Sequence, residues 1–400
     1  MRLRAPDRMA TDGKLAVRPR ILLVCSGLDH ARRGYESFAR ECFQELVDEP
    51  GIELELVKAS GPRAAQERVA WALRRDQRLA EGLGRLAGFR PFRLEALTFG
   101  LGLQPLLARR TPDLVYVSEW DTARTLARLR SLSRRPFRIL LSNGGFAVAG
   151  FDHLDHVQEL TPAARDHVLG LGADPARHTV LPYGFAIPRD LTELSPEEGI
   201  ALRGRLGLPE RRPILLSVAA LNRQHKRLDY VIEELAAIPA PRPFLLMAGE
   251  PGAETPGLRE LAEARLGGDG FAMRTVPAEE VISLYRAADL FVLGSLAEMQ
   301  GRALVEAAAY GIPCIAHDDA VMRFALGSAA MFGDFTRSGS LAQLLQAHQE
   351  RGAQELRTQA ERAHEHVYER FSWDRLRPRY VELLRAVGRA NSTVSSSSGE

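Results

Sequence analysis

Short apolar runs alternate along the chain with longer segments in which apolar residues recur at helical spacing. In the first half these runs are rich in Val, Ile and Leu and fall at 21–24, 52–57, 114–117 and 139–141. In the second half they fall at 214–218, 244–248, 290–293 and 313–316. This alternation is typical of parallel strands joined by crossover helices. It predicts an α/β protein with doubly wound parallel sheets.

This alternation of predicted strands and helices is interrupted once, in a turn-rich passage that contains Pro182, Gly184 and Pro188. A chain of 400 residues is about twice the length of a typical domain. We therefore predict two Rossmann-like domains, at 1–187 and 188–370, followed by a Ser-rich, disordered tail at 391–400. Ligands of such sheets bind beyond the carboxyl ends of the strands, so we expect the domains to face each other across a cleft.

Composition narrows the choice of partners. The 53 basic and 51 acidic side chains nearly cancel, which argues against nucleic acid as a partner. Cys25, Cys42 and Cys314 are widely spaced and lack the pattern of a disulfide framework or a zinc site, so we interpret them as reduced core thiols. The first twenty residues lack the apolar stretch of a signal peptide, and no run approaches the roughly 20 apolar residues of a membrane span. These features predict a cytoplasmic protein.

The most informative segment runs from 290 to 316. A strand is predicted to end at Gly294, a loop carries Glu298 to Gly301, and a helix runs from Arg302 to about Tyr310. The free N–H groups at the start of that helix suit a diphosphate. Glu298 lies beside this anion site and Glu306 about one turn inside the helix, so one carboxylate can face a sugar and the other a ribose. Taken alone, the spacing favours a simpler interpretation, in which both are solvated surface residues.

The same segment resembles the most specific signature of the retaining glycosyltransferases with the two-Rossmann GT-B fold, family 4, also called glycosyl transferases group 1. The positions in step with that signature are Ser295, Glu298, Gly301, Glu306, Ala307, Gly311 and Pro313. The resemblance implies a GT-B enzyme that moves a hexose-type sugar from a nucleotide-diphosphate donor to an acceptor hydroxyl with retention of configuration. It also implies that Met299, Gln300, Gly301, Arg302 and Glu306 bind the nucleotide-sugar.

Residues 214–235 resemble the first strand of the family's nucleotide domain and the basic loop after it. Lys226 fits the family's diphosphate-binding lysine, while Ala220 stands where an arginine is common, so Arg223 is expected to supply the missing guanidinium. We predict Arg223, Lys226 and Glu298 as the catalytic residues, Arg223 and Lys226 also binding the donor. The alternative for the basic residues is a solvated loop.

The remaining candidates follow from weaker resemblances. Gly34, at a predicted helix start, is expected to approach the donor phosphate, and Val276 to lie near the base. Asn143 occupies roughly the place of a histidine that contacts the donor sugar in many members, and His153 or His156 is a possible substitute. Residues 371–390 resemble the family's last helix, which packs back on the first domain.

No Asp-x-Asp pair that would bring Mg²⁺ to a diphosphate was recognised in the sequence, so we predict a metal-independent reaction without a cofactor. Two other classes stay open. One is another enzyme on this scaffold, such as a nucleotide-sugar epimerase or a phosphorylase. The other is a non-catalytic nucleotide-sugar-binding subunit, suggested by Ala220 and Asn143.

The acceptor is a glycan, a lipid or a small molecule. One segment bears on that choice, since residues 63–110 carry ten arginines against four acidic residues, interleaved with aromatic and aliphatic side chains. Such a surface can contact anionic lipid at the inner face of the membrane. The alternative, which we favour, is a helical insertion packed on the first domain with its arginines in water.

Overall fold

A computed structural model describes residues 18–31, 34–132, 136–147, 151–192 and 194–389. Contacts divide the chain into two compact units, one comprising residues 1–30, 43–140 and 381–400 and the other residues 31–42 and 141–380. The domain boundary at residue 188 stays a prediction, and the tail at 391–400 lies outside the described residues. Cys25, Cys42 and Cys314 are buried and free, as the sequence predicts.

The first sheet contains all four strands predicted in the first half of the chain. In the described part of the chain it has seven strands in the order β3-β2-β1-β4-β5-β6-β7, and every pair with a described register is parallel. Its strands are β1 (Arg20–Cys25), β2 (Glu53–Lys58), β3 (Glu67–Val69), β4 (Leu114–Val117), β5 (Arg138–Asn143), β6 (His156–Glu159) and β7 (His178–Val180). The short strands β3, β6 and β7 contain charged and polar residues and no apolar run, so the hydrophobic pattern did not predict them.

The second sheet reproduces the predicted strands of the second half of the chain nearly residue for residue. Its six described strands have the order β10-β9-β8-β11-β12-β13, and all their pairs are parallel. They are β8 (Ile214–Val218), β9 (Phe244–Ala248), β10 (Phe271–Arg274), β11 (Leu290–Leu293), β12 (Cys314–His317) and β13 (Met331–Gly333).

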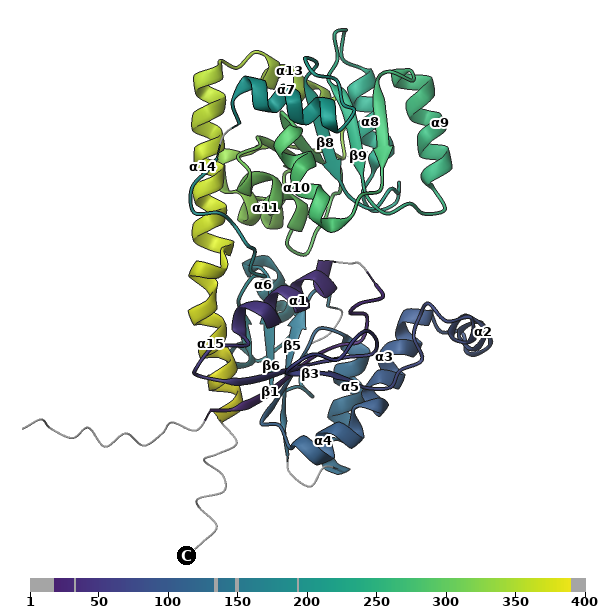
Figure 1. The fold of residues 1–400 in the computed structure, drawn as a ribbon, viewed down its shortest axis with the longest axis vertical. Helices are drawn as coiled ribbons and strands as arrows, with labels where there is room; N and C mark the ends of the chain where they lie inside the picture. The colour runs from purple at the N-terminus through teal and green to yellow at the C-terminus, as the bar shows by residue number, and fades with distance from the viewer. Residues whose placement is uncertain (1–17, 32–33, 133–135, 148–150, 193, 390–400) are drawn as a thin grey trace, which may run out of the picture. The chain divides into compact units, whose positions relative to one another are not determined.

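Helices follow most strands and cover the sheets (Figure 1). The earlier helices are α1 (Gly34–Leu46), α2 (Arg78–Ala87), α3 (Pro91–Gly102), α4 (Gln104–Arg110), α5 (Trp120–Leu129) and α6 (Pro162–Gly170). The later ones are α7 (Pro196–Arg205), α8 (Leu228–Ala236), α9 (Thr255–Leu266), α10 (Ala278–Ala287), α11 (Arg302–Ala309), α12 (Ala320–Leu326), α13 (Ser340–Gln349), α14 (Ala353–Phe371) and α15 (Trp373–Arg389). Single 3₁₀ turns lie at Arg130–Leu132, Pro175–Arg177 and Gly327–Ala329.

The second sheet has a buried layer on each face because alternate residues of a strand point to opposite sides. Leu215, Leu245 and Val292 join α8, α9 and α13 in one apolar cluster. Their neighbours Leu216 and Phe291 are equally buried and face the other side. Apolar residues on both faces are the reason these strands read as continuous hydrophobic runs.

Each sheet has one point where the strand order reverses direction. In the first sheet the chain proceeds outward from β1 through β2 to β3 and then resumes on the other side with β4. In the second sheet it proceeds from β8 through β9 to β10 and resumes with β11. Loops that follow the two strands at such a switch point form the usual ligand crevice of a doubly wound sheet. The loops that follow β8 and β11 are therefore the expected position of a ligand site.

Candidate functional site

The loops after β8 and β11 bring Lys226 and Glu298 together. The Lys226 ammonium donates to Glu298 Oε1, and Ser295 Oγ donates to the same oxygen at 2.7 Å. Asn222 Oδ1 accepts the backbone N–H of Lys226 at 2.8 Å, which fixes the loop that carries the lysine. The side chains of Lys226 and Glu298 keep 18% and 12% exposure. Two of the three predicted catalytic residues are thus paired and still partly exposed.

The start of α11 lies four residues beyond Glu298. Gly301 precedes the helix at φ 73°, a left-handed conformation that strains any residue with a side chain. The first helical bond runs from Leu304 N to Gly301 O at 2.9 Å. The N–H groups of Arg302 and Ala303 precede that bond and point out of the helix start. This geometry suits an anion.

Glu306 lies one turn into α11 in a network of its own. Its Oε1 accepts from Arg302 Nε at 2.7 Å, and its Oε2 accepts from the Tyr285 hydroxyl at 2.9 Å. Burial, reinforced by the Glu306 charge, raises the pKa of Tyr285 well above its ordinary value, so the hydroxyl remains a donor. Arg302 Nη2 also donates to Glu41 Oε1 at 2.5 Å. A ribose at Glu306 must share or replace these bonds.

Gly34 lies next to this network. It is the exposed first residue of α1, and a Cβ built on it would lie 3.9 Å from Arg302 Cδ. Glu41, on the same helix, binds the Arg302 guanidinium. The start of α1 therefore lies next to the start of α11, and the role of Gly34 at a donor phosphate stays a prediction.

A small cavity of about 220 Å³ connects Asn143 with Glu298 and Met299. Asn143 is buried, its Nδ2 donates to Glu159 Oε2 at 2.8 Å, and its Oδ1 accepts from Gly145 N at 3.3 Å. Glu159 Oε1 lies 2.9 Å from His178 Nδ1, so Glu159 links the buried His178 to Asn143. His153 and His156 are not among the cavity's lining residues, and His156 Nε2 bonds Thr179 Oγ1 at 2.8 Å.

Two predicted residues, Arg223 and Gln300, bond other parts of the chain in this structure. The exposed Arg223 donates from Nη2 to Gly257 O at 2.8 Å. Gln300 is buried, and its side chain bonds both the N–H and the carbonyl of Tyr183, at 2.8 and 3.2 Å. A donor contact through Gln300 is therefore left to its main chain. Val276 is partly exposed in the loop between β10 and α10.

A separate charged cluster occupies the switch point of the first sheet, and the sequence did not reveal it. Glu95 is fully buried on α3 and accepts from Ser26 Oγ at 2.7 Å and from Arg75 Nη2 at 2.6 Å. His30 Nε2 lies 3.1 Å from its other oxygen. Burial alone would raise the pKa of Glu95, but the bonds from His30, Arg75 and Ser26 outweigh it and hold that pKa well below its usual range.

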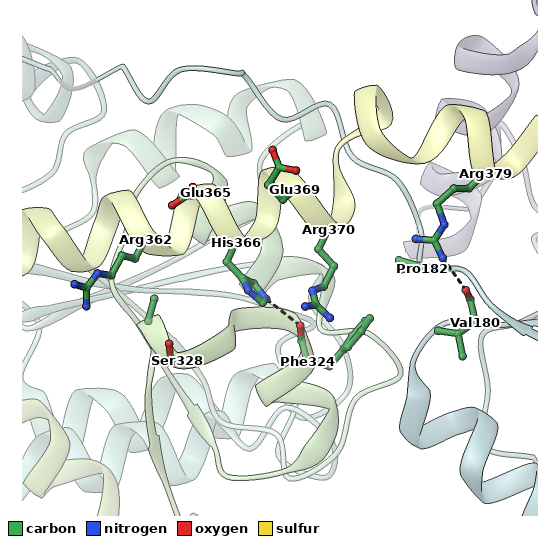
Figure 2. A pocket seen from close by; sticks show the side chains of 11 residues that line it. Val180, Pro182, Phe324, Ser328, Arg362, Glu365, His366, Glu369, Arg370 and Arg379 are labelled. Atoms are coloured by element: carbon green, nitrogen blue, oxygen red, sulfur yellow. Dashed lines mark hydrogen bonds between the residues drawn. The ribbon is translucent and has the colours of Figure 1, made fainter.

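A larger hollow of about 640 Å³ lies along α14 (Figure 2). Arg362, His366 and Arg370 project into it from α14, and Arg379 donates to Val180 O at 3.2 Å. His366 Nε2 bonds Phe324 O at 3.2 Å, and burial lowers the pKa of this imidazole. None of the predicted site residues lines this hollow, so it is distinct from the candidate site.

Within the described residues, no three His, Cys, Asp or Glu side chains gather as metal ligands would. The same part of the chain contains no helix that is both long enough and apolar enough to cross a bilayer.

Comparison with solved structures identifies the fold. Sucrose-phosphate synthase from Thermosynechococcus elongatus superposes with a TM-score of 0.76 at 19% identity, over 93% of this chain and 100% of that one. HepE from Anabaena, in complex with UDP-glucose, gives a TM-score of 0.70 at 18% identity, over 92% of this chain and 100% of that one. The protein has the GT-B fold, and the fold prediction is confirmed.

Sequence comparison finds a family match over the part of the chain that forms the second sheet. Residues 200–347, which include Lys226 and Glu298, match the family model of the glycosyl transferases group 1. A D-inositol 3-phosphate glycosyltransferase from Geodermatophilus obscurus is 33% identical over 212 residues, which is 49% of this chain and 45% of that protein. This chain therefore spans less than half the length of that relative.

Proposed function

We propose that this protein is a glycosyltransferase that moves a hexose from a nucleoside diphosphate, UDP foremost, to an acceptor hydroxyl with retention of anomeric configuration. The observation that carries the proposal is the Lys226–Glu298 pair beside the open start of α11. Both lie in the segment that matches the glycosyl transferases group 1. The choice of UDP is supported by HepE, a GT-B structure in complex with UDP-glucose.

The diphosphate binds at the start of α11. The N–H groups of Arg302 and Ala303 and the positive end of the helix dipole face it, while Lys226 adds a full charge. The start of α1 borders the site on the other side, where a Cβ on Gly34 would lie 3.9 Å from Arg302 Cδ. As the bond between the anomeric carbon and the phosphate oxygen breaks, both electrons stay on that oxygen. Lys226 and the helix start stabilise the developing charge.

Glu298 exchanges its hydrogen-bond partners when the donor binds. In the structure its Oε1 accepts from both Lys226 and Ser295. When the donor binds, Lys226 turns to the phosphate oxygens and Glu298 accepts hydrogen bonds from sugar hydroxyls. The carboxylate thereby orients the hexose. The cavity that Glu298 shares with Asn143 receives the sugar or the acceptor group next to it.

The acceptor hydroxyl attacks from the face that the diphosphate leaves. Its oxygen forms the new bond to the anomeric carbon, and its proton passes to an oxygen of the departing diphosphate. Retention rests on the resemblance of the 295–313 segment to retaining enzymes. Because Lys226 and the helix start supply the positive charge at the diphosphate, the proposed step needs no divalent cation and no cofactor.

The direct test incubates the purified chain with UDP-, GDP- and dTDP-hexoses, an acceptor panel and EDTA, and measures the free nucleoside diphosphate. We expect UDP release that EDTA does not abolish, and NMR of the product should show the donor's anomeric configuration. Release that requires a divalent cation would contradict metal independence. An inverted product would contradict retention.

One observation favours a second candidate, a non-catalytic subunit that binds nucleotide-sugars. Asn143 stands where a protonatable histidine is common in the family, and its amide is already bonded to Glu159 and Gly145. Tight binding of UDP-hexose without turnover across the acceptor panel would support this candidate over the enzyme.

A further inference from the structure

Helix α2 packs on the molecule through its small residues and presents its large ones to solvent. Ala80 is fully buried and Gly84 is also buried, one turn apart on the same face. A Cβ on Gly84 would lie 2.7 Å from Phe89 O, so only glycine allows this close approach. By contrast Leu79, Leu83 and Leu86 are 62%, 41% and 86% exposed. This inverts the usual arrangement, in which the leucines of an amphipathic helix face the core.

The exposed leucines form one stripe. Positions 79, 83 and 86 follow the i, i+4, i+7 spacing that aligns side chains along a helix. Trp71, seven residues before the helix, is 65% exposed. An exposed indole is typical of residues that insert at the boundary between lipid headgroups and acyl chains. We call Trp71, Leu79, Leu83 and Leu86 the α2 stripe.

Positive charge flanks the stripe. Arg78 begins α2 and Arg90 follows it by three residues; both are exposed, and neither forms an ion pair with another described residue. The nearby acidic residues offer little opposing charge. Asp76 pairs with Arg74, Glu95 is buried, and Glu67 pairs with Lys58, which leaves Glu81.

We propose that the α2 stripe docks this protein on the surface of an anionic lipid bilayer. The leucines enter the interface while Arg78 and Arg90 meet lipid phosphates, the arrangement of a helix that lies in the plane of a membrane surface. A second copy is a poorer occupant, because a symmetric contact through the same stripe would bring the arginines of both copies together. The inference does not depend on the proposed glycosyl transfer.

The test is co-sedimentation of the full chain with vesicles, either of phosphatidylcholine alone or of equal parts phosphatidylcholine and phosphatidylglycerol. We expect binding to the anionic vesicles that weakens with salt. The triple variant Leu79→Ser, Leu83→Ser, Leu86→Ser should bind at least about tenfold more weakly. Arg78→Gln with Arg90→Gln should reduce binding to anionic vesicles.

The matched control is Ile282→Ser, which removes an apolar side chain of 45% exposure on α10 and should leave vesicle binding unchanged. Thermal melts establish that each variant folds. Absence of binding by the wild type, or equal binding by wild type and triple variant, would overturn the proposal. So would a triple variant that only converts a dimer to a monomer in sedimentation velocity, because the stripe would then cover a second copy.

Discussion

The two sheets place charged residues at the same topological position and use them differently. At the switch point of the first sheet, Ser26 follows β1 and bonds Glu95, which is fully buried with Arg75 and His30 around it. At the switch point of the second sheet, Lys226 and Glu298 form a pair that remains partly exposed, beside a helix start with free N–H groups.

The difference shows that topology locates a crevice but does not say whether it binds a ligand. Glu95 has each oxygen occupied by donors from the chain itself, so the cluster contributes to the structure of the first sheet. Lys226 has further donors to offer, and the start of α11 has N–H groups that precede the first helical bond. An incompletely satisfied, solvent-accessible charge pair is what a charged ligand needs.

The largest expected effect is on the stability of the first sheet. Glu95→Ala leaves the Arg75 guanidinium and His30 without their carboxylate, so the free energy of unfolding should fall by about 3 kcal/mol. Urea denaturation measures it. Glu95→Gln keeps the shape of the side chain, so its free energy of unfolding should fall by less, and the variant should still bind UDP. Loss of UDP affinity in the folded Gln variant would contradict the structural role.

The next largest effect is on turnover. Lys226→Ala should lower kcat by about a hundredfold, because it removes a charge that faces the leaving diphosphate. Its melting temperature should stay close to that of the wild type. Arg223→Ala is the matched comparison and should cost about tenfold or less, since its guanidinium is engaged with Gly257. A larger loss of kcat for Arg223→Ala than for Lys226→Ala would show that Arg223 contributes more to stabilising the leaving diphosphate.

A smaller effect is expected on nucleotide affinity. Glu306→Gln weakens the acceptor proposed for the ribose hydroxyls, so the Kd for UDP should rise about tenfold in calorimetric titration. Glu41→Gln is the control, because Glu41 also pairs with Arg302 but is not assigned to the ribose. Equal losses in both variants would show that Glu306 acts only by holding Arg302.

The smallest effect concerns acid stability. The folded-state pKa of Glu95 lies below its ordinary value of 4.5, so its contribution is complete above that value and is lost as the pH falls below it. Glu95→Gln should therefore flatten the stability curve on the acid side of about pH 4.5. Urea midpoints at a series of acidic pH values measure this, and an unchanged slope would refute the assignment.

The sequence predicted much of the fold because the strands at the centre of each sheet are buried on both faces. Their apolar runs at β4, β8, β9 and β11 coincide with the observed strands. Strands such as β6 and β7 contain His156, Glu159 and His178 and have no such run. Their place in the sheet depends on neighbours far away in sequence, which a local pattern does not contain.

The site was predictable only where its residues are close in sequence. The segment from Ser295 to Pro313 carries its own spacing, and the observed α11 begins at the predicted residue. The pairing of Arg302 with Glu41 joins residues 261 positions apart and left no local signal. The binding of Gln300 to the Tyr183 backbone is likewise a tertiary feature. Glu95 lies among apolar residues of α3, and only the tertiary structure shows that it is buried and bonded to Ser26 and Arg75.

The most direct test of the central claim is hydrogen–deuterium exchange of the whole chain with and without UDP, at a concentration that calorimetry shows to be saturating. We predict slower exchange in peptides that cover residues 222–228 and 298–305, and unchanged exchange in peptides around Ser26 and Glu95. Protection confined to the first switch point, or saturating UDP without protection at 298–305, would contradict the account.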